Sequence, residues 1–180
     1  MKNENDINLN LHKIETHPFE PFIPPDIKYL IIGSFPGKGQ TEVGTNSDLW
    51  FYSAKRNTFW KILEAVYNTP LKTKKSKQDL FRKTNMGIAD IILKAVRKDN
   101  TNSDTNLEII ELNDTAIKKI VELNSIITIF FTSKFVERLF KKIFPHLFNT
   151  IALPSPSPRF AKMSLAEKIN IYKKYLPQPE

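Results

Sequence analysis

Three segments of the chain combine glycine, amide, hydroxyl and aromatic residues at spacings that suit ligand binding. The first is GSFPG at residues 33–37, which follows the apolar run 29–32. Glycine directly after a strand lets a ligand approach the backbone and leaves amide N–H groups available as donors. A nucleotide P-loop needs four residues between its glycines, followed by Lys and then Ser or Thr. Only three residues separate Gly33 from Gly37, so the pattern predicts a ligand-binding turn but not a P-loop.

The second segment carries Phe51 and Tyr52, followed by Arg56 and Asn57. An aromatic ring beside a glycine-rich loop can stack on a nucleobase. An asparagine side chain offers both a donor and an acceptor, so it can orient a water molecule or recognise the edge of a base. Two structural interpretations stay open. Asn57, directly before Thr58, also suits a helix N-cap, and the two aromatic rings also suit a hydrophobic core.

The third segment is LPSPSPRF at residues 153–160. Its three prolines stiffen the loop, and the hydroxyl groups of Ser155 and Ser157 could bond to phosphate oxygens. Arg159 and Phe160 could contact a nucleic-acid backbone or wedge into a base stack. A loop of Pro and Ser is also an ordinary rigid connection between elements. Its expected position, at the same sheet edge as the GSFPG turn, favours the functional interpretation.

Hydrophobic periodicity predicts the elements that must position these segments. Short apolar runs predict buried strands, and apolar residues at helical spacing predict amphipathic helices. The expected strands are residues 29–32, 88–96, 126–131 and 150–153, and the expected helices are residues 58–67, 76–85, 114–123, 133–143 and 164–175. Strands that alternate with helices imply a parallel sheet with helices on both faces, which is an α/β fold of three layers. In such folds ligands bind at the carboxyl ends of the strands.

Two segments fit no regular element in this pattern. Residues 17–26 are rich in proline and should lie extended along the surface, whereas residues 97–113 are charged and rich in Asn, Asp and Thr, which predicts a loop. A chain of 180 residues suits one domain. We expect a flexible segment at residues 1–16, a single domain at 17–176 and a short tail at 177–180.

Composition excludes several classes of protein. The chain contains no cysteine and only three histidines, so neither a disulfide framework nor a metal site is expected. No apolar run reaches the roughly 18 residues of a membrane span, and the polar N-terminus does not resemble a signal peptide. We therefore expect a soluble cytoplasmic protein. The formal charge of +8 favours polyanions such as nucleic acid, although it is also typical of a lysine-rich solvated surface.

Taken together, the motifs resemble the uracil-DNA glycosylase superfamily, and most closely its hypoxanthine-DNA (deoxyinosine) glycosylase branch. The resemblance rests on GSFPG at residues 33–37, FYSAKRNTFW at 51–60, GIADII at 87–92 and LPSPSPRFAKMSLAEK at 153–168, and it spans residues 17–175. It implies a four-stranded parallel sheet between helices, which agrees with the fold expected from periodicity. It also implies a monofunctional, monomeric enzyme that removes hypoxanthine or uracil from DNA without a metal or nucleotide cofactor.

The resemblance also implies roles for individual residues. The catalytic residue is Asn57, from the Arg-Asn pair of the second segment. The base pocket contains Gly33, Ser34, Phe35, Pro36 and Gly37, with Phe51 or Tyr52 as the residue that stacks on the base. The residues expected to contact DNA are Arg56, Ser155, Ser157, Arg159 and Phe160.

The chain departs from the family pattern at two places. Gly-His-Pro usually precedes the Arg-Asn pair, whereas this chain has Ser53-Ala54-Lys55, and small or amide residues are commoner at Arg159-Phe160. The first departure removes a histidine and a rigid proline beside the expected catalytic residue. One alternative function is therefore a catalytically silent nucleic-acid-binding module of the same fold. A second is a nucleoside hydrolase for small molecules, which would need neither the Pro/Ser loop nor the positive charge.

Overall fold

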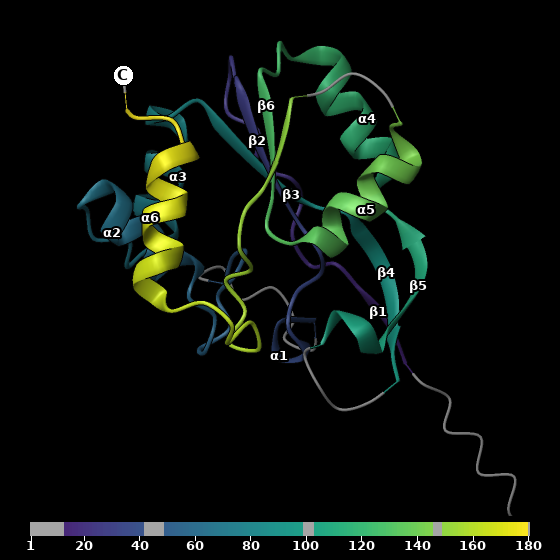
Figure 1. Cartoon of the computed structure of the whole chain (residues 1–180). Helices are drawn as coiled ribbons and strands as arrows, with labels where there is room; N and C mark the ends of the chain where they lie inside the picture. The colour runs from purple at the N-terminus through teal and green to yellow at the C-terminus, as the bar shows by residue number, and fades with distance from the viewer. Residues whose placement is uncertain (1–12, 42–48, 99–102, 146–148, 180) are drawn as a thin grey trace, which may run out of the picture.

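The computed structural model describes residues 13–41, 49–98, 103–145 and 149–179. A parallel sheet with the strand order β3-β2-β6-β7 forms its centre. The strands are β2 (Tyr29–Gly33), β3 (Met86–Asp90), β6 (Thr128–Phe131) and β7 (Thr150–Ala152). One face is covered by α2 (Phe59–Tyr67), α3 (Lys74–Lys83) and α6 (Leu165–Tyr175), and the other by α4 (Asp114–Leu123) and α5 (Lys134–Ile143) (Figure 1). The predicted three-layer α/β fold with four parallel strands is confirmed.

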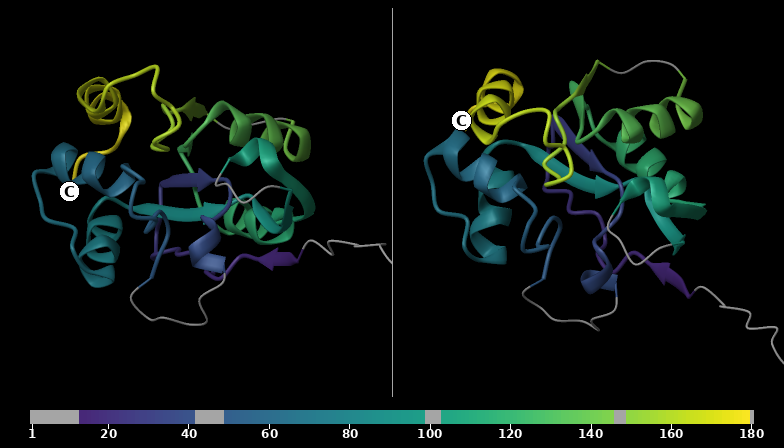
Figure 2. Two further views of the ribbon diagram at one scale, coloured as in Figure 1. Left: turned by 90° about the horizontal axis from the view of Figure 1, so that it is seen from below. Right: turned by 60° about the horizontal axis from the view of Figure 1, so that its bottom comes forward.

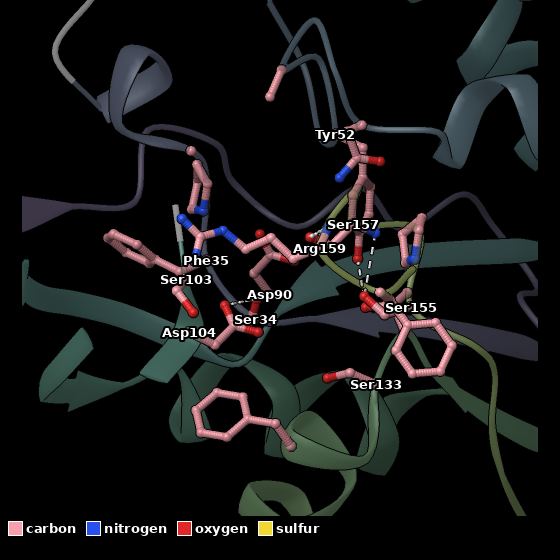
Figure 3. Close-up of a pocket in the computed structure, with 18 of the residues that line it drawn as sticks. Ser34, Phe35, Tyr52, Asp90, Ser103, Asp104, Ser133, Ser155, Ser157 and Arg159 are labelled. Atoms are coloured by element: carbon pink, nitrogen blue, oxygen red, sulfur yellow. Dashed lines mark hydrogen bonds between the residues drawn. The ribbon is translucent and has the colours of Figure 1, made fainter. Parts of the chain in front are cut away.

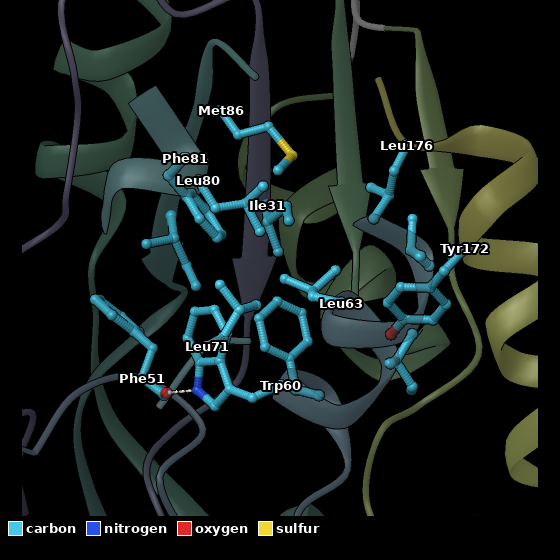
Figure 4. Close-up of a cluster of buried hydrophobic side chains, with 14 of the residues drawn as sticks. Ile31, Phe51, Trp60, Leu63, Leu71, Leu80, Phe81, Met86, Tyr172 and Leu176 are labelled. Carbon is cyan, nitrogen blue, oxygen red and sulfur yellow. Dashed lines mark hydrogen bonds between the residues drawn. The ribbon is translucent and has the colours of Figure 1, made fainter. Parts of the chain in front are cut away.

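Alternating side chains of β2 divide the core into two clusters. Successive residues of a strand point to opposite faces of its sheet. Ile31 packs with Trp60 and other residues of the layer formed by α2, α3 and α6 (Figure 4). Leu30 and Ile32 pack instead with the buried side chains of α4 and α5. The apolar run that predicted this strand is therefore buried on both faces, as a central parallel strand should be.

All four parallel strands end at one edge of the sheet. Gly33, the last residue of β2, lies opposite Asp90, the last residue of β3. On the other side, Ile32 lies opposite Phe131, which lies opposite Ala152. The segments that follow these strands therefore meet at this edge, which Figure 2 (left) views from below. The register places the GSFPG turn and the Pro/Ser loop in one region of the molecule.

The prediction of one strand at residues 88–96 is wrong, because the chain changes sheets after Asp90. The strand β3 ends there, and β4 (Ile92–Arg97) belongs to a second, antiparallel sheet with the order β1-β4-β5. The amide of Ile91 donates to the carbonyl of Gly33 (2.9 Å), which closes the parallel ladder at this edge. Apolar residues run through the change of direction, so periodicity alone does not reveal it.

Two further segments differ from expectation. Residues 97–113 contain a short 3-10 helix, η1 (Asp104–Asn106), and the strand β5 (Leu107–Leu112), which pairs with β4. Leu107, Ile109 and Leu112 of β5 pack on the core, while the residues between them face solvent, so the charged residues of this segment concealed a half-buried strand. Within the expected flexible segment, β1 (Ile14–Thr16) also pairs with β4, whereas residues 1–12 lie outside the described part of the chain.

The helix ends follow the sequence closely. Ser133 caps α5, and Ser164 forms a capping box with Glu167 at the start of α6. The helix α3 starts at Lys74, two residues before the predicted start, and Asn113 is the cap residue of α4. A one-turn helix, α1 (Lys38–Thr41), follows the GSFPG turn. Across the described ranges, none of the helices is long and apolar enough to cross a membrane.

Candidate active site

A cavity of about 840 Å³ lies at the carboxyl edge of the parallel sheet. All three segments identified from the sequence contribute to its wall (Figure 3). The predicted site residues on the wall are Ser34, Phe35, Pro36, Gly37, Phe51, Tyr52, Arg56, Asn57, Ser155, Ser157, Arg159 and Phe160. Gly33, the remaining predicted pocket residue, is buried at the end of β2 directly before these residues and is not part of the wall. The volume falls in the range of about 300–1,000 Å³ that is common for small-ligand pockets.

Asn57 lies two residues before α2, next to the N-cap residue Thr58, and lines the cavity. Its Oδ1 accepts a hydrogen bond from the backbone amide of Phe59 (2.9 Å). This bond satisfies one of the amides that a helix start leaves without a partner inside the helix. Because Oδ1 is used in this way, the Nδ2 amino group is the donor that the side chain can offer to a ligand. The capping role and a role at the cavity are therefore compatible.

The two aromatic residues of the second segment lie in different surroundings. Phe51 is 2% exposed, and its carbonyl accepts a hydrogen bond from the indole nitrogen of Trp60 (2.7 Å; Figure 4). Most of its ring area therefore belongs to the core. Tyr52 stacks on Phe59, with ring centroids 4.2 Å apart, and its hydroxyl lies 2.9 Å from Oγ1 of Thr132. Tyr52 also has a φ of 56°, in the left-handed region that few residues of its type adopt.

The GSFPG turn packs too tightly for any side chain at its first position. A Cβ atom at Gly33 would lie 2.2 Å from Oδ1 of Asp90 and 2.2 Å from the hydroxyl of Tyr52. The requirement for glycine here is one of space, since no glycine in the described residues has a positive φ. The carbonyl of Pro36 accepts a hydrogen bond from Nη2 of Arg97 (2.8 Å), and the hydroxyl of Ser34 donates to Oδ1 of Asp104 (2.9 Å).

Backbone carbonyls fix the Pro/Ser loop on two helices. The carbonyl of Pro156 accepts from both the amide and the hydroxyl of Thr58, at 3.0 and 2.8 Å. The carbonyl of Pro154 accepts from the hydroxyl of Tyr172 in α6 (2.9 Å). Beyond these anchors Arg159 is exposed, and Nζ of the buried Lys168 lies 5.3 Å from the ring of Phe160. The loop is thus held at its base, with an exposed cation at its tip.

Motif reasoning missed a buried pair, His17 and Asp90. Nε2 of His17 lies 2.9 Å from Oδ2 of Asp90, and both side chains are less than 8% exposed. The amide of Phe19 donates to Nδ1 of the same ring (3.1 Å), so Nδ1 must carry a lone pair and the proton belongs on Nε2. Neutral His17 therefore donates to the carboxyl group of Asp90. The available signal was Asp90 itself, an acidic residue inside an apolar run.

Three other charged residues of the wall were also missed, namely Arg97, Asp104 and Arg138. Burial raises the pKa of Asp104, and the hydrogen bond from Ser34 opposes this shift. Arg97 donates to both carboxylate oxygens of Glu15 (2.9 and 3.1 Å) and so ties β1 to the GSFPG turn through Pro36.

Burial, with a smaller contribution from Asp90, raises the pKa of Tyr52 well above its ordinary value. In the part of the chain that the structure describes, no three His, Asp or Glu side chains are grouped as metal ligands would be.

Comparison with known proteins identifies the family. The family model described as "Uracil DNA glycosylase superfamily" matches residues 20–177. The chain therefore belongs to the uracil DNA glycosylase superfamily. Nothing in these comparisons distinguishes the hypoxanthine branch from the other branches.

A solved structure supports the same fold. It is the solution NMR structure of "a putative Uracil DNA glycosylase" from Methanosarcina acetivorans, which matches with a TM-score of 0.62 and 19% sequence identity. The match covers 90% of this chain and 98% of that one, so the two share the architecture over nearly their whole length. Among curated proteins, no sequence matches.

Proposed function

We propose that this protein is a monofunctional DNA glycosylase that hydrolyses the N-glycosidic bond of hypoxanthine or uracil in DNA, as the first step of base excision repair. The observation that carries the proposal is the convergence of Asn57, the GSFPG turn and the Pro/Ser loop on one cavity of a uracil DNA glycosylase fold. The pairing of GSFPG with RNTFW supports the hypoxanthine branch. We expect the enzyme to act as a cytoplasmic monomer on damaged DNA.

The loop would open the duplex. A base inside a duplex cannot be attacked, so the enzyme must rotate it out of the stack at a cost of a few kcal/mol. A deaminated base pairs poorly, which lowers this cost and supplies part of the selectivity. Exposed Arg159 suits contact with the phosphate backbone, and Phe160 suits insertion between base pairs. The anchors at Pro154 and Pro156 would hold this wedge in place while the DNA distorts.

The cavity would then stabilise the transition state. As the bond breaks, the sugar gains oxocarbenium character and negative charge grows on the departing base. Nδ2 of Asn57 is placed to donate to the base or to the attacking water, and backbone amides of the GSFPG turn suit the growing negative charge. Phe51 or Tyr52 would stack on the ring of the base. Direct hydrolysis of this kind needs neither a metal nor a nucleotide cofactor.

Asn57 offers a sharp test, because its capping role and its proposed catalytic role use different atoms. Asn57→Ala removes both groups of the amide. Asn57→Asp keeps an oxygen that can accept from Phe59 and loses the Nδ2 donor. Asn170→Ala, at an exposed position of α6, is the matched control. The assay is strand cleavage after alkali treatment of oligonucleotides that carry one hypoxanthine, uracil or xanthine.

We expect alkali-dependent cleavage by the wild type and by the Asn170→Ala variant, and loss of cleavage in both Asn57 variants. DNA binding should remain close to that of the wild type, and Asn57→Asp should preserve thermal stability better than Asn57→Ala. Full activity of the Asn57→Asp variant would contradict the catalytic role. Absence of wild-type activity on every substrate, with salt-sensitive DNA binding, would instead establish the catalytically silent module and implicate Ser53-Ala54-Lys55.

A further inference from the structure

The carboxyl group of Asp90 lies on the cavity wall beside the GSFPG turn. Asp90 ends β3 at the position opposite Gly33, is 6% exposed and forms part of the wall next to Ser34 (Figure 3). The GSFPG turn itself contains no carboxylate. The neighbouring strand therefore brings an acidic group to the point where the turn begins.

One oxygen of this carboxyl group is held firmly. Oδ2 accepts from Nε2 of His17 at 2.9 Å, and the orientation of the imidazole is set by the amide of Phe19 on Nδ1. The imidazole is further enclosed by the rings of Phe19, Phe35 and Phe51, whose centroids lie 5.6–6.0 Å from its own. His17 thus has little freedom to turn, and it fixes the direction of the Asp90 side chain.

The other oxygen has no partner. Oδ1 of Asp90 is a buried acceptor without a hydrogen bond within the described residues. The hydroxyl of Tyr52 lies close by, across Gly33, but it is paired with Thr132. Buried polar groups are rarely left unpaired, and exceptions often mark sites where a ligand or catalytic partner completes the network. The carboxyl group of this wall residue therefore combines one fixed oxygen with one buried, unsatisfied oxygen.

We propose that Asp90 is a catalytic residue of the glycosylase reaction and that His17 is its positioning residue. This inference rests on the proposed function. Oδ1 accepts a hydrogen bond from a water molecule whose oxygen attacks C1′ of the deoxyribose. The C1′–N bond breaks, and its electron pair leaves with the base. The water proton passes to Oδ1, and the departing base takes up a proton from solvent, so that the products are the free base and an abasic site.

Electrostatics favours a role for Asp90 beside the sugar rather than beside the base. An ionised carboxylate stabilises the positive charge that develops at the sugar and opposes the negative charge that develops on the base. Asp90 is therefore suited to the water and the oxocarbenium centre, whereas Asn57 and the backbone amides are suited to the base. The two groups reach the cavity from different strands and loops, which gives the two charges of the transition state separate partners.

The test compares Asp90→Asn with Asp79→Asn, a matched substitution at a partly exposed position of α3 that lies outside the cavity wall. Single-turnover rates and DNA affinities are measured on hypoxanthine and uracil substrates, together with thermal melting. We expect Asp90→Asn to lower the rate about 100-fold or more on both bases, as is typical for loss of a general base, with DNA affinity unchanged. Asp79→Asn should match the wild type.

Several outcomes would overturn the inference. An Asp90→Asn rate within about threefold of the Asp79→Asn rate would exclude a catalytic role. Loss of activity on only one of the two bases would indicate that Asp90 recognises the base and does not catalyse the reaction. A wild type that cleaves no substrate refutes the proposed function itself, which is a distinguishable result because it does not depend on any variant.

His17 supplies the second measurement, which decides the matter if Asp90→Asn does not fold. His17→Gln keeps a side-chain donor that can reach Asp90, whereas His17→Ala removes it. We expect the rate to fall about tenfold in His17→Ala and to recover partly in His17→Gln, with equal DNA affinity in both. Equal rates in His17→Ala and the wild type would contradict the positioning role.

Discussion

The amide and the hydroxyl of Thr58 both donate to the carbonyl oxygen of Pro156, at 3.0 and 2.8 Å. This pair of bonds joins the start of α2 to the Pro/Ser loop. Asn57 directly precedes Thr58, so the proposed catalytic amide and the proposed DNA wedge share one support. A displacement of the loop on DNA binding would therefore be transmitted to Asn57 through a single residue.

Thr58→Val tests this connection, because it keeps the shape of the side chain and the backbone N–H but removes the hydroxyl bond. We expect the free energy of unfolding to fall by about 1 kcal/mol. The value of kcat/KM on duplex substrate should fall about fivefold, which corresponds to the same energy. Chemical denaturation and cleavage kinetics provide the two measurements. Thr115→Val, at an exposed position of α4, should change neither quantity. A loss of stability with unchanged kcat/KM would show that the hydrogen bond between Thr58 and Pro156 supports the fold and does not affect catalysis.

The space around Gly33 leads to a second prediction. Gly33→Ala would place a methyl group 2.2 Å from both Oδ1 of Asp90 and the hydroxyl of Tyr52. We expect a loss of about 1–3 kcal/mol in the free energy of unfolding, as for other overpacked sites, and loss of glycosylase activity. Gly39→Ala is the matched control, because a Cβ there has no atom within 4 Å. Equal stability of the two variants, measured by urea denaturation, would contradict the packing described for Gly33.

The buried carboxyl group of Asp104 should make stability depend on pH. Burial raises its pKa in the folded state, so the folded protein holds this proton at pH values where the unfolded chain has released it. The stabilising contribution of the neutral group is complete below about pH 4 and is lost as the pH rises through the folded-state pKa. Asp104→Asn keeps an oxygen that can accept from Ser34 but cannot ionise.

The quantity to measure is the difference in the free energy of unfolding between Asp104→Asn and the wild type, and we expect this difference to change with pH. As the pH rises from about 4 to 7, the free energy of unfolding of Asp104→Asn should increase relative to that of the wild type. Asp79→Asn should show no such increase, because the hydrogen bond from Lys75 lowers the pKa of Asp79 and the stability that this carboxylate contributes is lost only as the pH falls below about 4. Urea denaturation at both pH values checks the two variants. The same trend in both variants would refute the role of burial at Asp104.

Local sequence patterns predicted the architecture and identified three segments that line the candidate site. The apolar run of β2 and the GSFPG turn identify a strand that stops at a defined residue, and such ends meet at one edge of a parallel sheet. The helix that starts after Asn57 and the Pro/Ser loop are likewise local patterns. Each of these signals lies within a few consecutive residues, and that is why sequence alone could place them.

The rest depends on contacts between distant segments. The approach of His17 to Asp90 spans 73 positions and lies in a segment whose prolines predict only an extended chain. The end of β3 at Asp90 is invisible to hydrophobicity, because Ile91 and Ile92 continue the apolar run into another sheet. The charged residues of β5 similarly conceal a strand that becomes stable only through pairing with β4.

The position of His17 has a practical consequence for where the protein can be cut. The range that matches the family begins at residue 20, after both β1 and His17. A version trimmed to that range would keep Asn57, the GSFPG turn and the Pro/Ser loop, and would look complete by every motif. It would nevertheless leave one edge of β4 unpaired, deprive Arg97 of Glu15 and release the side chain of Asp90. Shortened or N-terminally fused versions should therefore retain the chain from at least residue 13 onward.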